Sequence, residues 1–365
     1  MGLFSRKESG ATALIIDIGS SSVGGAYARF TRGAVPEVLY VIRVPVARRE
    51  GEATSLEGME RALNETCDLL VGEGGPAALR AIGSAHIDRI IVSTGPPWEE
   101  ALVRVLHIED GKPFTFTRSL VKDSDTGKEA ASGRRMTEDQ IILVKLNGYE
   151  TRQPYGKRAS QAEVTVLTST IAEEAAAAVD QAVSKAFHTR ALRLRAFLPA
   201  AFSALASLYP HQKDHLIIVA GGDATNIALV SKGVLAGIRS IPLGVNPGVR
   251  SAEDRTDATA QARLTDEWLA ATQKEAMTLA GDAGMPGTVF LITHQEARDA
   301  LMAALSGARW RSDAMTVVPI SAAHLSSAVR TRADTDPDTG LTLLALAEAR
   351  AFEEEALEGD TPVAA

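Results

Sequence analysis

Two short stretches of glycine and small polar residues have the composition of phosphate-binding loops. Residues 17–22 read Asp-Ile-Gly-Ser-Ser-Ser, and residues 221–226 read Gly-Gly-Asp-Ala-Thr-Asn. Each stretch lies between two apolar runs, so each is predicted to be the tip of a β-hairpin. Backbone N–H groups in such a tip can donate to phosphate oxygens, because small side chains let the backbone come close. Two such tips in one chain are what a nucleotide cleft between paired lobes requires.

The candidate site residues follow from these two tips. Asp17 stands at the end of its strand, where a carboxylate can hold Mg²⁺ through a water molecule, and it is the single predicted metal ligand. No catalytic residue is predicted. The residues predicted to bind the phosphates of a nucleotide are Asp17, Gly19, Ser20, Ser21 and Ser22 in the first tip, and Gly221, Gly222, Thr225 and Asn226 in the second.

Other residues that could do chemistry have weaker support. His211 and His215 have the spacing of a metal-binding pair on a helix, but no third ligand lies near them in the sequence, and a metal site needs three or four. We interpret both as solvated loop residues. Cys67 lies in a predicted helix without a paired base, which indicates a small core residue rather than a nucleophile. The chain has no Ser-His-Asp arrangement and no Walker-type lysine loop.

The composition limits the class of protein. The chain has 365 residues, enough for two domains and a smaller insert. Its net charge of −8 argues against a broad nucleic-acid-binding surface, and its lone cysteine indicates a reducing cytoplasm. No apolar run approaches the roughly 20 residues that cross a bilayer. We interpret residues 1–7, Met-Gly-Leu-Phe-Ser-Arg-Lys, as a frayed tail, with a short tether to a partner or membrane surface as the alternative.

The elements that would position the two tips occur in the same order twice. Strand, tip, strand and strand follow one another over residues 13–46 and again over residues 216–242, which indicates a duplicated fold. The polar stretch 109–137 is predicted to be loops or an exposed small module. Further strands are predicted at residues 87–93, 140–146, 162–168 and 288–293, and helices at 55–70, 172–187, 252–280, 295–305 and 341–356.

Several of these segments resemble one superfamily. Residues 14–23 and 219–227 are similar to the two phosphate loops of the actin/Hsp70/sugar-kinase superfamily, and residues 196–206 and 340–347 are similar to its connecting segments. Residues 146–170 resemble the small subdomain that FtsA carries in place of an actin subdomain. The chain thus resembles the bacterial actin-like FtsA/PilM family. This implies an α/β, actin-like (RNase H-like) fold of two lobes with a small α+β insert of the FtsA type (SHS2-like).

The same resemblance implies the domain boundaries. Residues 1–83 and 171–210 form the first lobe, to which a helix at 338–356 returns. Residues 84–170 form the insert. Residues 211–337 form the second lobe, with a helical subdomain at about 247–287.

The resemblance fails at residues that would bind and hydrolyse ATP. Active relatives usually open the second loop with Asp, place a polar residue before the proline of the connecting segment and keep two glycines in the adenosine-binding turn. Some also have a phosphate-binding Lys beside the first loop. At these four places this chain has Val219, Leu198, His294 with Gln295, and Gly24. Mg·ATP is therefore expected to bind weakly or not at all, and the chain is predicted to be a degenerate ATPase rather than an enzyme.

The resemblance also implies a cytoplasmic scaffold. The first prediction is an FtsA-like, non-hydrolysing protein of cell division that links a tubulin-like filament to the membrane and can self-associate. The alternative is a PilM-like platform of type IV pilus assembly, which binds the cytoplasmic tail of an inner-membrane protein. FtsA proteins end in a basic amphipathic helix, whereas the last predicted helix of this chain carries acidic residues at 353–355 and no face rich in Lys or Arg, which favours peripheral attachment to the inner membrane through a partner. A small-molecule kinase of the sugar-kinase branch is disfavoured, because phosphoryl transfer needs a metal that Val219 cannot hold.

Overall fold

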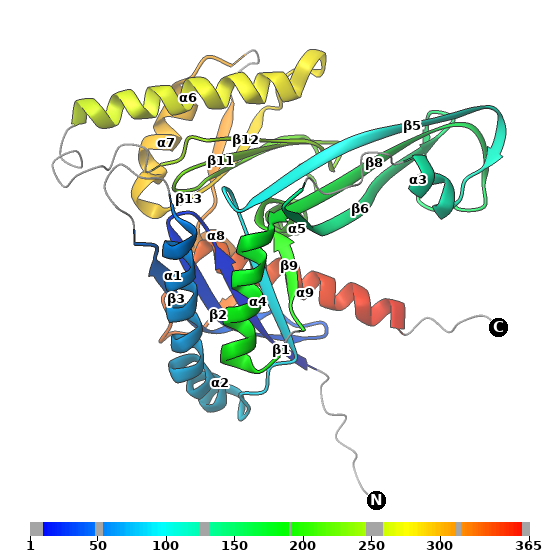
Figure 1. Ribbon diagram of the computed structural model, residues 1–365. Coiled ribbons are helices and arrows are strands. Elements are labelled where there is room, and N and C mark those ends of the chain that lie inside the picture. The colour runs from blue at the N-terminus through cyan, green and yellow to red at the C-terminus, as the bar shows by residue number, and fades with distance from the viewer. Residues whose placement is uncertain are drawn as a thin grey trace, which may run out of the picture.

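The protein has two α/β lobes and a separate four-stranded insert that projects from the first lobe (Figure 1). Residues 1–7, the predicted tail or tether, lie outside the described part of the chain. The computed structural model describes residues 10–47, 54–124, 132–189, 191–245, 258–310 and 315–359.

The first lobe is built on a six-stranded sheet with the order β15-β3-β2-β1-β4-β9. The central strand β1 is apolar and buried along almost its whole length, as is typical of a strand covered on both faces. β4 runs parallel to β1, and β9 runs parallel to β4. The strands are β1 (Gly10–Ile18), β2 (Ser22–Thr31), β3 (Glu37–Pro45), β4 (Arg89–Thr94), β9 (Arg193–Ala196) and β15 (Arg330–Thr331).

Helices cover both faces of this sheet. On one face, α1 begins at an N-cap in which Ser55 Oγ accepts from the Gly58 N–H at 3.1 Å, and α2 ends at Gly83, whose φ of 71° suits glycine. On the other face, α5 carries Pro199 in its first turn, where proline is tolerated. The outer-face helices are α1 (Leu56–Leu69), η1 (Leu70–Gly74), α2 (Gly75–Ile82) and α4 (Glu173–Phe187); the inner-face helices are α5 (Phe197–Leu208), α8 (Ala322–Leu325) and α9 (Thr339–Gly359).

The second lobe repeats the plan of the first with a five-stranded sheet, β12-β11-β10-β13-β14. Its first three strands form an antiparallel meander, and β13 runs parallel to β10, as β4 does to β1. The elements are β10 (His215–Ala220), β11 (Thr225–Ser231), β12 (Val234–Ile241), β13 (Thr288–Thr293) and β14 (Thr316–Pro319), with α6 (Ala258–Ala280), η2 (Gly281–Ala283) and α7 (Gln295–Gly307) on one face.

One apolar core joins the two lobes. Ile15 of β1 belongs to the same buried cluster as Ile217 of β10 and Phe290 of β13. Ala204 of α5 and Leu344 of α9 lie between them in that cluster. Because the inner helices pack on both sheets, the lobes are held together by buried apolar surface as well as by the polar contacts described below.

The insert is a sheet with the order β5-β8-β6-β7 and a small core of its own. Its predicted start at residue 84 is corrected here, because β4 pairs with β1 and β9 in the sheet of lobe one. The polar stretch 109–137, expected to be loops or an exposed small module, contains the end of the long strand β5, the helix α3 and the start of β6, all of which belong to the insert. The elements are β5 (Glu99–Thr115), α3 (Arg118–Ser124), β6 (Arg134–Leu146), β7 (Tyr149–Glu150) and β8 (Arg158–Ala172).

Candidate nucleotide cleft

Both predicted hairpin tips are present, and they close in the same way. In the first, the Gly19 N–H donates to the Ser22 carbonyl oxygen at 3.0 Å. In the second, the Gly221 N–H donates to the Ala224 carbonyl oxygen at 3.0 Å. The strand plan of each lobe therefore brings one tip to the junction between the lobes, as the duplicated sequence pattern predicted.

The two tips contact each other directly. The Asp223 N–H donates to Ser20 Oγ at 2.9 Å, so one amide of the second tip is already bound by the first. The Asp223 carboxylate accepts from the Thr54 N–H at 3.0 Å and from the Thr54 hydroxyl. Ser21 Oγ and His294 Nε2 form a further hydrogen bond of 3.1 Å between the lobes. Polar groups that were expected to face a nucleotide are thus hydrogen-bonded to one another.

An arginine sits on the predicted metal ligand. The guanidinium of Arg43, from β3, lies 2.9 Å from Asp17 Oδ2 through NH2 and 2.6 Å from Asp338 Oδ2 through Nε. NH2 also donates to Asp338 Oδ1 at 3.0 Å, and NH1 donates to Ser22 Oγ at 3.0 Å. The planar fork of arginine suits such paired acceptors. We refer to Asp17, Arg43 and Asp338 as the clasp.

Glycine makes the clasp possible. Gly24 lies opposite Arg43 in the β2–β3 ladder, and a Cβ at Gly24 would lie 2.6 Å from NH2 of Arg43. A Cβ at Gly340 would lie 3.2 Å from Asp17 Oδ2. Gly24 is the position where the sequence lacks the lysine of some relatives. The structure therefore places a positive charge there from the neighbouring strand and directs it at the protein's own carboxylates.

Burial and the charge of Arg43 together shift the pKa values of the acidic and imidazole groups in and beside the clasp. Burial raises the pKa of Asp17, and the attraction of Arg43 only partly offsets this. Burial also acts to raise the pKa of Asp338, but the charge and hydrogen bonds of Arg43 and the Leu341 N–H outweigh it, so the pKa of Asp338 lies below its usual value. Burial and the nearby Arg43 lower the pKa of His294, which keeps its imidazole neutral at pH 7.

The second tip is closed over by the chain that follows β12. The Val245 N–H donates to the Gly221 carbonyl oxygen at 2.8 Å, and a Cβ at Gly244 would lie 2.3 Å from the carbonyl oxygens of Gly221 and Gly222. The buried Thr225 hydroxyl donates to the Leu243 carbonyl oxygen at 2.7 Å and accepts from Trp268 Nε1 at 2.8 Å. Thr225 and the buried Asn226 begin β11, so both belong to the strand that supports the tip.

These residues do not fit Mg·ATP in this arrangement. The carboxylate that would hold the metal through water is bound by Arg43 instead. Val219 and the fully buried Leu198 are apolar at the places where active relatives have an acid and a polar residue. His294 projects toward Ser21, where the adenosine-binding turn would have glycine. Among the described residues, no group of three or more His, Cys, Asp or Glu could hold a metal ion.

The interpretation of His215 as a solvated loop residue was wrong. It begins β10 and is buried, with its ring edge-on to Phe290 at 4.9 Å and its Nδ1–H donating to the Gln212 carbonyl oxygen at 3.1 Å. An imidazole can be buried here because one nitrogen is hydrogen-bonded and the ring faces are apolar. His211 is exposed, as expected.

Arg43, Asp338 and Thr54 were missed by the sequence reasoning. Arg43 is the one charged residue among the apolar residues 38–46, and a lone charge in a buried strand indicates a fixed partner. Asp338 follows a proline directly before the predicted last helix and accepts from the Leu341 N–H at 2.9 Å, as an N-cap does. Neither signal says which residues are partners.

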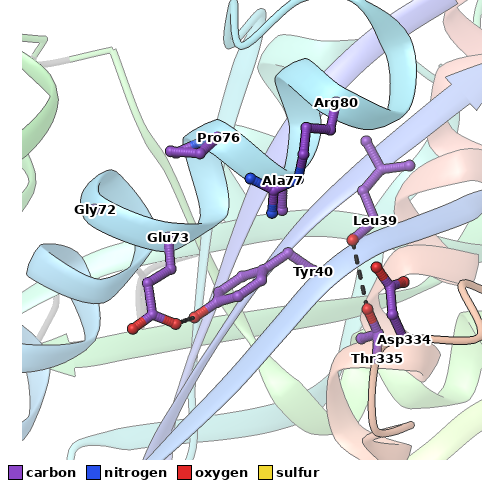
Figure 2. Close-up of a pocket in the computed structure, with 9 residues that line it drawn as sticks. All are labelled: Leu39, Tyr40, Gly72, Glu73, Pro76, Ala77, Arg80, Asp334 and Thr335. Carbon is purple, nitrogen blue, oxygen red and sulfur yellow. Dashed lines mark hydrogen bonds between the residues drawn. The ribbon is translucent and has the colours of Figure 1, made fainter.

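A hollow of about 350 Å³ lies away from the clasp, at the outer edge of lobe one (Figure 2). The Tyr40 hydroxyl donates to the Glu73 carboxylate at 2.9 Å across it, and burial together with Glu73 raises the pKa of Tyr40 to about 12. Its walls carry charges of both signs. The lining residues are Leu39, Tyr40, Gly72, Glu73, Pro76, Ala77, Arg80, Asp334 and Thr335.

Comparison with known proteins establishes the fold. No family model and no curated protein matches the sequence. The structure is similar to that of the PilM–PilN type IV pilus biogenesis complex, with a TM-score of 0.59 and 12% identity over 93% of this chain and 98% of that chain. It also matches a protein of actin-like ATPase fold and unknown function from Bacteroides thetaiotaomicron, with a TM-score of 0.48 and 8% identity over 94% and 98% of the two chains. The chain has the actin-like ATPase fold, with two α/β lobes.

Proposed function

We propose that this protein is an actin-fold scaffold that does not hydrolyse ATP and that binds the cytoplasmic tail of an inner-membrane protein. The observation that carries the first half is the clasp, in which Arg43 takes the place of a metal-bound water on Asp17. The second half, binding to the tail of an inner-membrane protein, is supported by the similarity to a structure described as a type IV pilus biogenesis complex of PilM with PilN. In this proposal the protein is a cytoplasmic platform, peripheral at the membrane through its partner.

The clasp opposes nucleotide binding in two ways: it occupies the carboxylate that would hold the metal, and separating its ion pairs costs free energy. For Mg²⁺ to reach Asp17, the guanidinium would have to leave both Asp17 and Asp338. Separating such charges inside a protein is costly, because the remaining charge loses its partner without regaining full solvation. The bound nucleotide would also have to displace Ser20 from the Asp223 N–H. These costs support a scaffold whose lobes stay closed on each other.

The division scaffold predicted first from the sequence remains the second candidate. Its support is the resemblance of residues 146–170 to the FtsA subdomain; the insert sheet itself does not distinguish the two candidates, because the PilM match covers 93% of this chain. In that role the partner would be a tubulin-like filament, and the insert would contact neighbouring copies. The small-molecule kinase gains no support, because Val219 and Leu198 give no acid to the reaction.

Calorimetric titration tests the nucleotide half of the proposal. We expect no binding heat with Mg·ATP and no change in melting temperature at millimolar nucleotide, because ligand binding would stabilise the fold by mass action. Binding at micromolar concentration or tighter would overturn this half.

A binding assay tests the partner half separately. The probe is a peptide with the cytoplasmic tail of a PilN-like inner-membrane protein from the same genome, and a tubulin-like division protein serves as the competing candidate. We expect the tail peptide to bind with the same affinity in the presence and absence of Mg·ATP. Binding of the division protein alone would favour the second candidate, and binding of neither would reject the partner half while leaving the nucleotide half intact.

A further inference from the structure

A buried network of charged residues lies at the root of the insert. It joins Glu138 of β6, Arg195 of β9 and Glu348 of α9, so it connects the insert, the edge of the lobe-one sheet and the last helix. Arg195 Nε lies 3.4 Å from Glu138 Oε1, and Arg195 NH1 contacts Glu348 Oε1. Glu138 Oε2 also accepts from the Ala196 N–H at 3.2 Å. We refer to these three side chains as the root network.

Glu99, the first residue of β5, adjoins the root network and has no partner of its own. It is 2% exposed, and neither of its carboxyl oxygens has a hydrogen-bond partner within the described part of the chain. Thr137 Oγ1 and Ser169 Oγ, in the neighbouring strands β6 and β8, are also buried and unpartnered there. An ionised carboxylate in such surroundings is unfavourable, because nothing replaces its lost hydration.

The charged groups around Glu99 do not compensate for its charge. Burial raises the pKa of Glu99 well above its usual value, and repulsion from Glu138 adds to this, against the attraction of Arg134. The Arg134 guanidinium is held by Thr170, to whose hydroxyl and carbonyl oxygens it donates at 2.8 and 2.9 Å. Arg195 is shared between the two carboxylates of the root network. The adjacent Glu100 adds a further negative charge.

The residue before Glu99 connects this root to the first tip. Trp98 Nε1 donates to the Gly19 carbonyl oxygen at 3.4 Å, while the Trp98 carbonyl oxygen accepts from the Ala172 N–H at 2.9 Å. The other end of the connection is α9, which begins directly after Asp338 of the clasp and carries Glu348 of the root network. A displacement at the root would therefore reach the cleft from two sides.

We propose that Glu99 is a proton-operated latch between the insert and lobe one. While its carboxyl group is neutral, the insert packs on β9 and α9 of lobe one through the root network, and its strands β5 and β6 also lie against β12 of lobe two. Loss of the proton adds a negative charge to a site whose two arginines, Arg134 and Arg195, are already paired, and the root of the insert shifts on lobe one so that the carboxylate reaches water. This proposal is independent of the partner and of nucleotide binding.

The sign of the pH dependence follows from proton binding. The latched state holds the proton of Glu99 more tightly than a released or unfolded state does. Latching is therefore complete below the ordinary pKa of Glu and weakens as the pH rises toward the raised pKa of the latched state. Between those two values, the ratio of released to latched molecules rises about tenfold per pH unit.

Distance measurements between spin labels test the latch. One label goes on the insert at Tyr149→Cys, which is 78% exposed, and the other on lobe one at Leu79→Cys, which is 54% exposed. Cys67 stays unlabelled, because it is buried and its pKa is raised to about 12. We expect one narrow distance distribution at the lowest pH at which the protein is folded, and a second or broader one as the pH is raised. Glu99→Gln should keep the low-pH distribution throughout.

Another carboxylate of β5 supplies a matched control. Glu109→Gln removes an exposed carboxylate of the same strand that takes no part in the root network, so this variant should respond to pH as the parent does. Nuclear magnetic resonance of ¹³C-labelled glutamate carboxyls gives a second readout, in which the Glu99 signal is titrated in the parent protein and is assigned by its loss in Glu99→Gln. A Glu99 carboxyl that titrates in the ordinary range of Glu would overturn the proposal. So would a distance distribution with the same pH response in the parent and in Glu99→Gln.

Discussion

Arg43 is a charged residue in an otherwise apolar strand, and its guanidinium serves two carboxylates at once. Asp17 lies in the next strand but one, and Asp338 is 295 positions away in the chain. The clasp therefore forms only when lobe one and the start of α9 are both in place. Its side chains are 24% exposed for Arg43, 12% for Asp17 and 16% for Asp338, so solvent screens the three charges only partly.

Replacing Arg43 by Ala should destabilise the protein. Asp17 and Asp338 would keep their burial but lose the guanidinium, and we expect the free energy of unfolding to fall by about 3 kcal/mol. Denaturation by urea measures this. Arg61→Ala is the matched control, because that side chain is 64% exposed and its partner Glu57 is 4.0 Å away, and it should change stability by less than about 0.5 kcal/mol. Equal effects of the two substitutions would show that the clasp contributes nothing.

Asp338→Asn should alter the stability of the protein in a pH-dependent way. Asn keeps the N-cap acceptor for the Leu341 N–H but carries no charge for Arg43, so on the order of 2 kcal/mol should be lost at neutral pH. The folded pKa of Asp338 is lowered, so its charge stabilises the fold above the ordinary pKa of Asp, and this stabilisation disappears as the pH falls through the lowered value.

The difference between the parent protein and Asp338→Asn should therefore shrink toward acid pH. Urea denaturation at several pH values between neutral and strongly acidic measures it. Asp334→Asn is the control, because its side chain is 71% exposed and is paired at the surface with Arg332. A difference that stayed constant with pH would contradict the assignment of the effect to the Asp338 charge.

The candidate site could be predicted from the sequence only where its chemistry is local. Asp17 and the glycines of both tips were recognised, because a strand end, a turn and a second strand are encoded within ten or so residues. The sequence also indicated that Val219 cannot hold a metal. Arg43 could not be assigned, because its partners are distant in the chain and any of several acids could have met it. Gly24 was recognised as a missing lysine, but the sequence does not say what fills the space.

At the scale of elements, the strands were more predictable than the sheets they join. The apolar residues 87–93 were predicted as a strand, and β4 (Arg89–Thr94) lies there. The same apolar run could form a strand of the insert or of a lobe, and only its pairing with β1 shows that it belongs to the sheet of lobe one. The long β5 (Glu99–Thr115) was not predicted at all, and its polar second half is stabilised as a strand by pairing with β8.

Two deletions should show whether the insert begins after β4, as in the structure, or at residue 84, as predicted from the sequence. Glu100 and Thr170 are direct partners in the β5–β8 ladder, so residues 101–169 can be replaced by Asn-Gly, a two-residue turn that joins such partners. We expect this variant to unfold cooperatively on heating, because lobe one keeps β4 and its partners. Deletion of residues 84–170 removes β4 from between β1 and β9 and should leave no cooperative transition.

Circular dichroism during thermal unfolding measures both deletions. The first variant loses Leu167 and its neighbours from the shared core, so its melting temperature should be lower than that of the parent. Loss of cooperativity in the first variant would mean that the insert is part of the folding unit of lobe one. Cooperative unfolding of the second would contradict the requirement of lobe one for β4.

At the scale of the whole molecule, the two lobes are closed by three kinds of contact. The shared core between the sheets is apolar, the tips are joined through Ser20 and Asp223, and Ser21 meets His294 above the clasp. All of these contacts are made by the chain's own residues.

The far end of α9 bears on how the protein meets a membrane. Phe352 packs against Phe30 with ring centroids 6.2 Å apart, and Arg89 lies over the Phe352 ring at 5.2 Å. Glu355 is paired with Arg89 at 2.7 Å. The apolar side of this helix is therefore used in packing, and the acidic residues around it are repelled by anionic lipid. No helix in the described ranges has the length and apolar character to cross a membrane.

Attachment to membranes should therefore depend on a partner. In a liposome sedimentation assay at physiological salt, we expect the protein to stay in the supernatant of vesicles that contain anionic lipid. It should pellet when the cytoplasmic tail of its partner is displayed on the same vesicles, and polymerisation or multiple tails would strengthen this through avidity. Leu3 and Phe4 could insert, but two such side chains give at most roughly 3–6 kcal/mol before ordering costs, enough only for weak binding. Salt-resistant pelleting without any partner, in a variant that lacks residues 1–8, would mean that the end of α9 leaves Phe30 and Arg89 to enter the bilayer, and would contradict attachment through a partner.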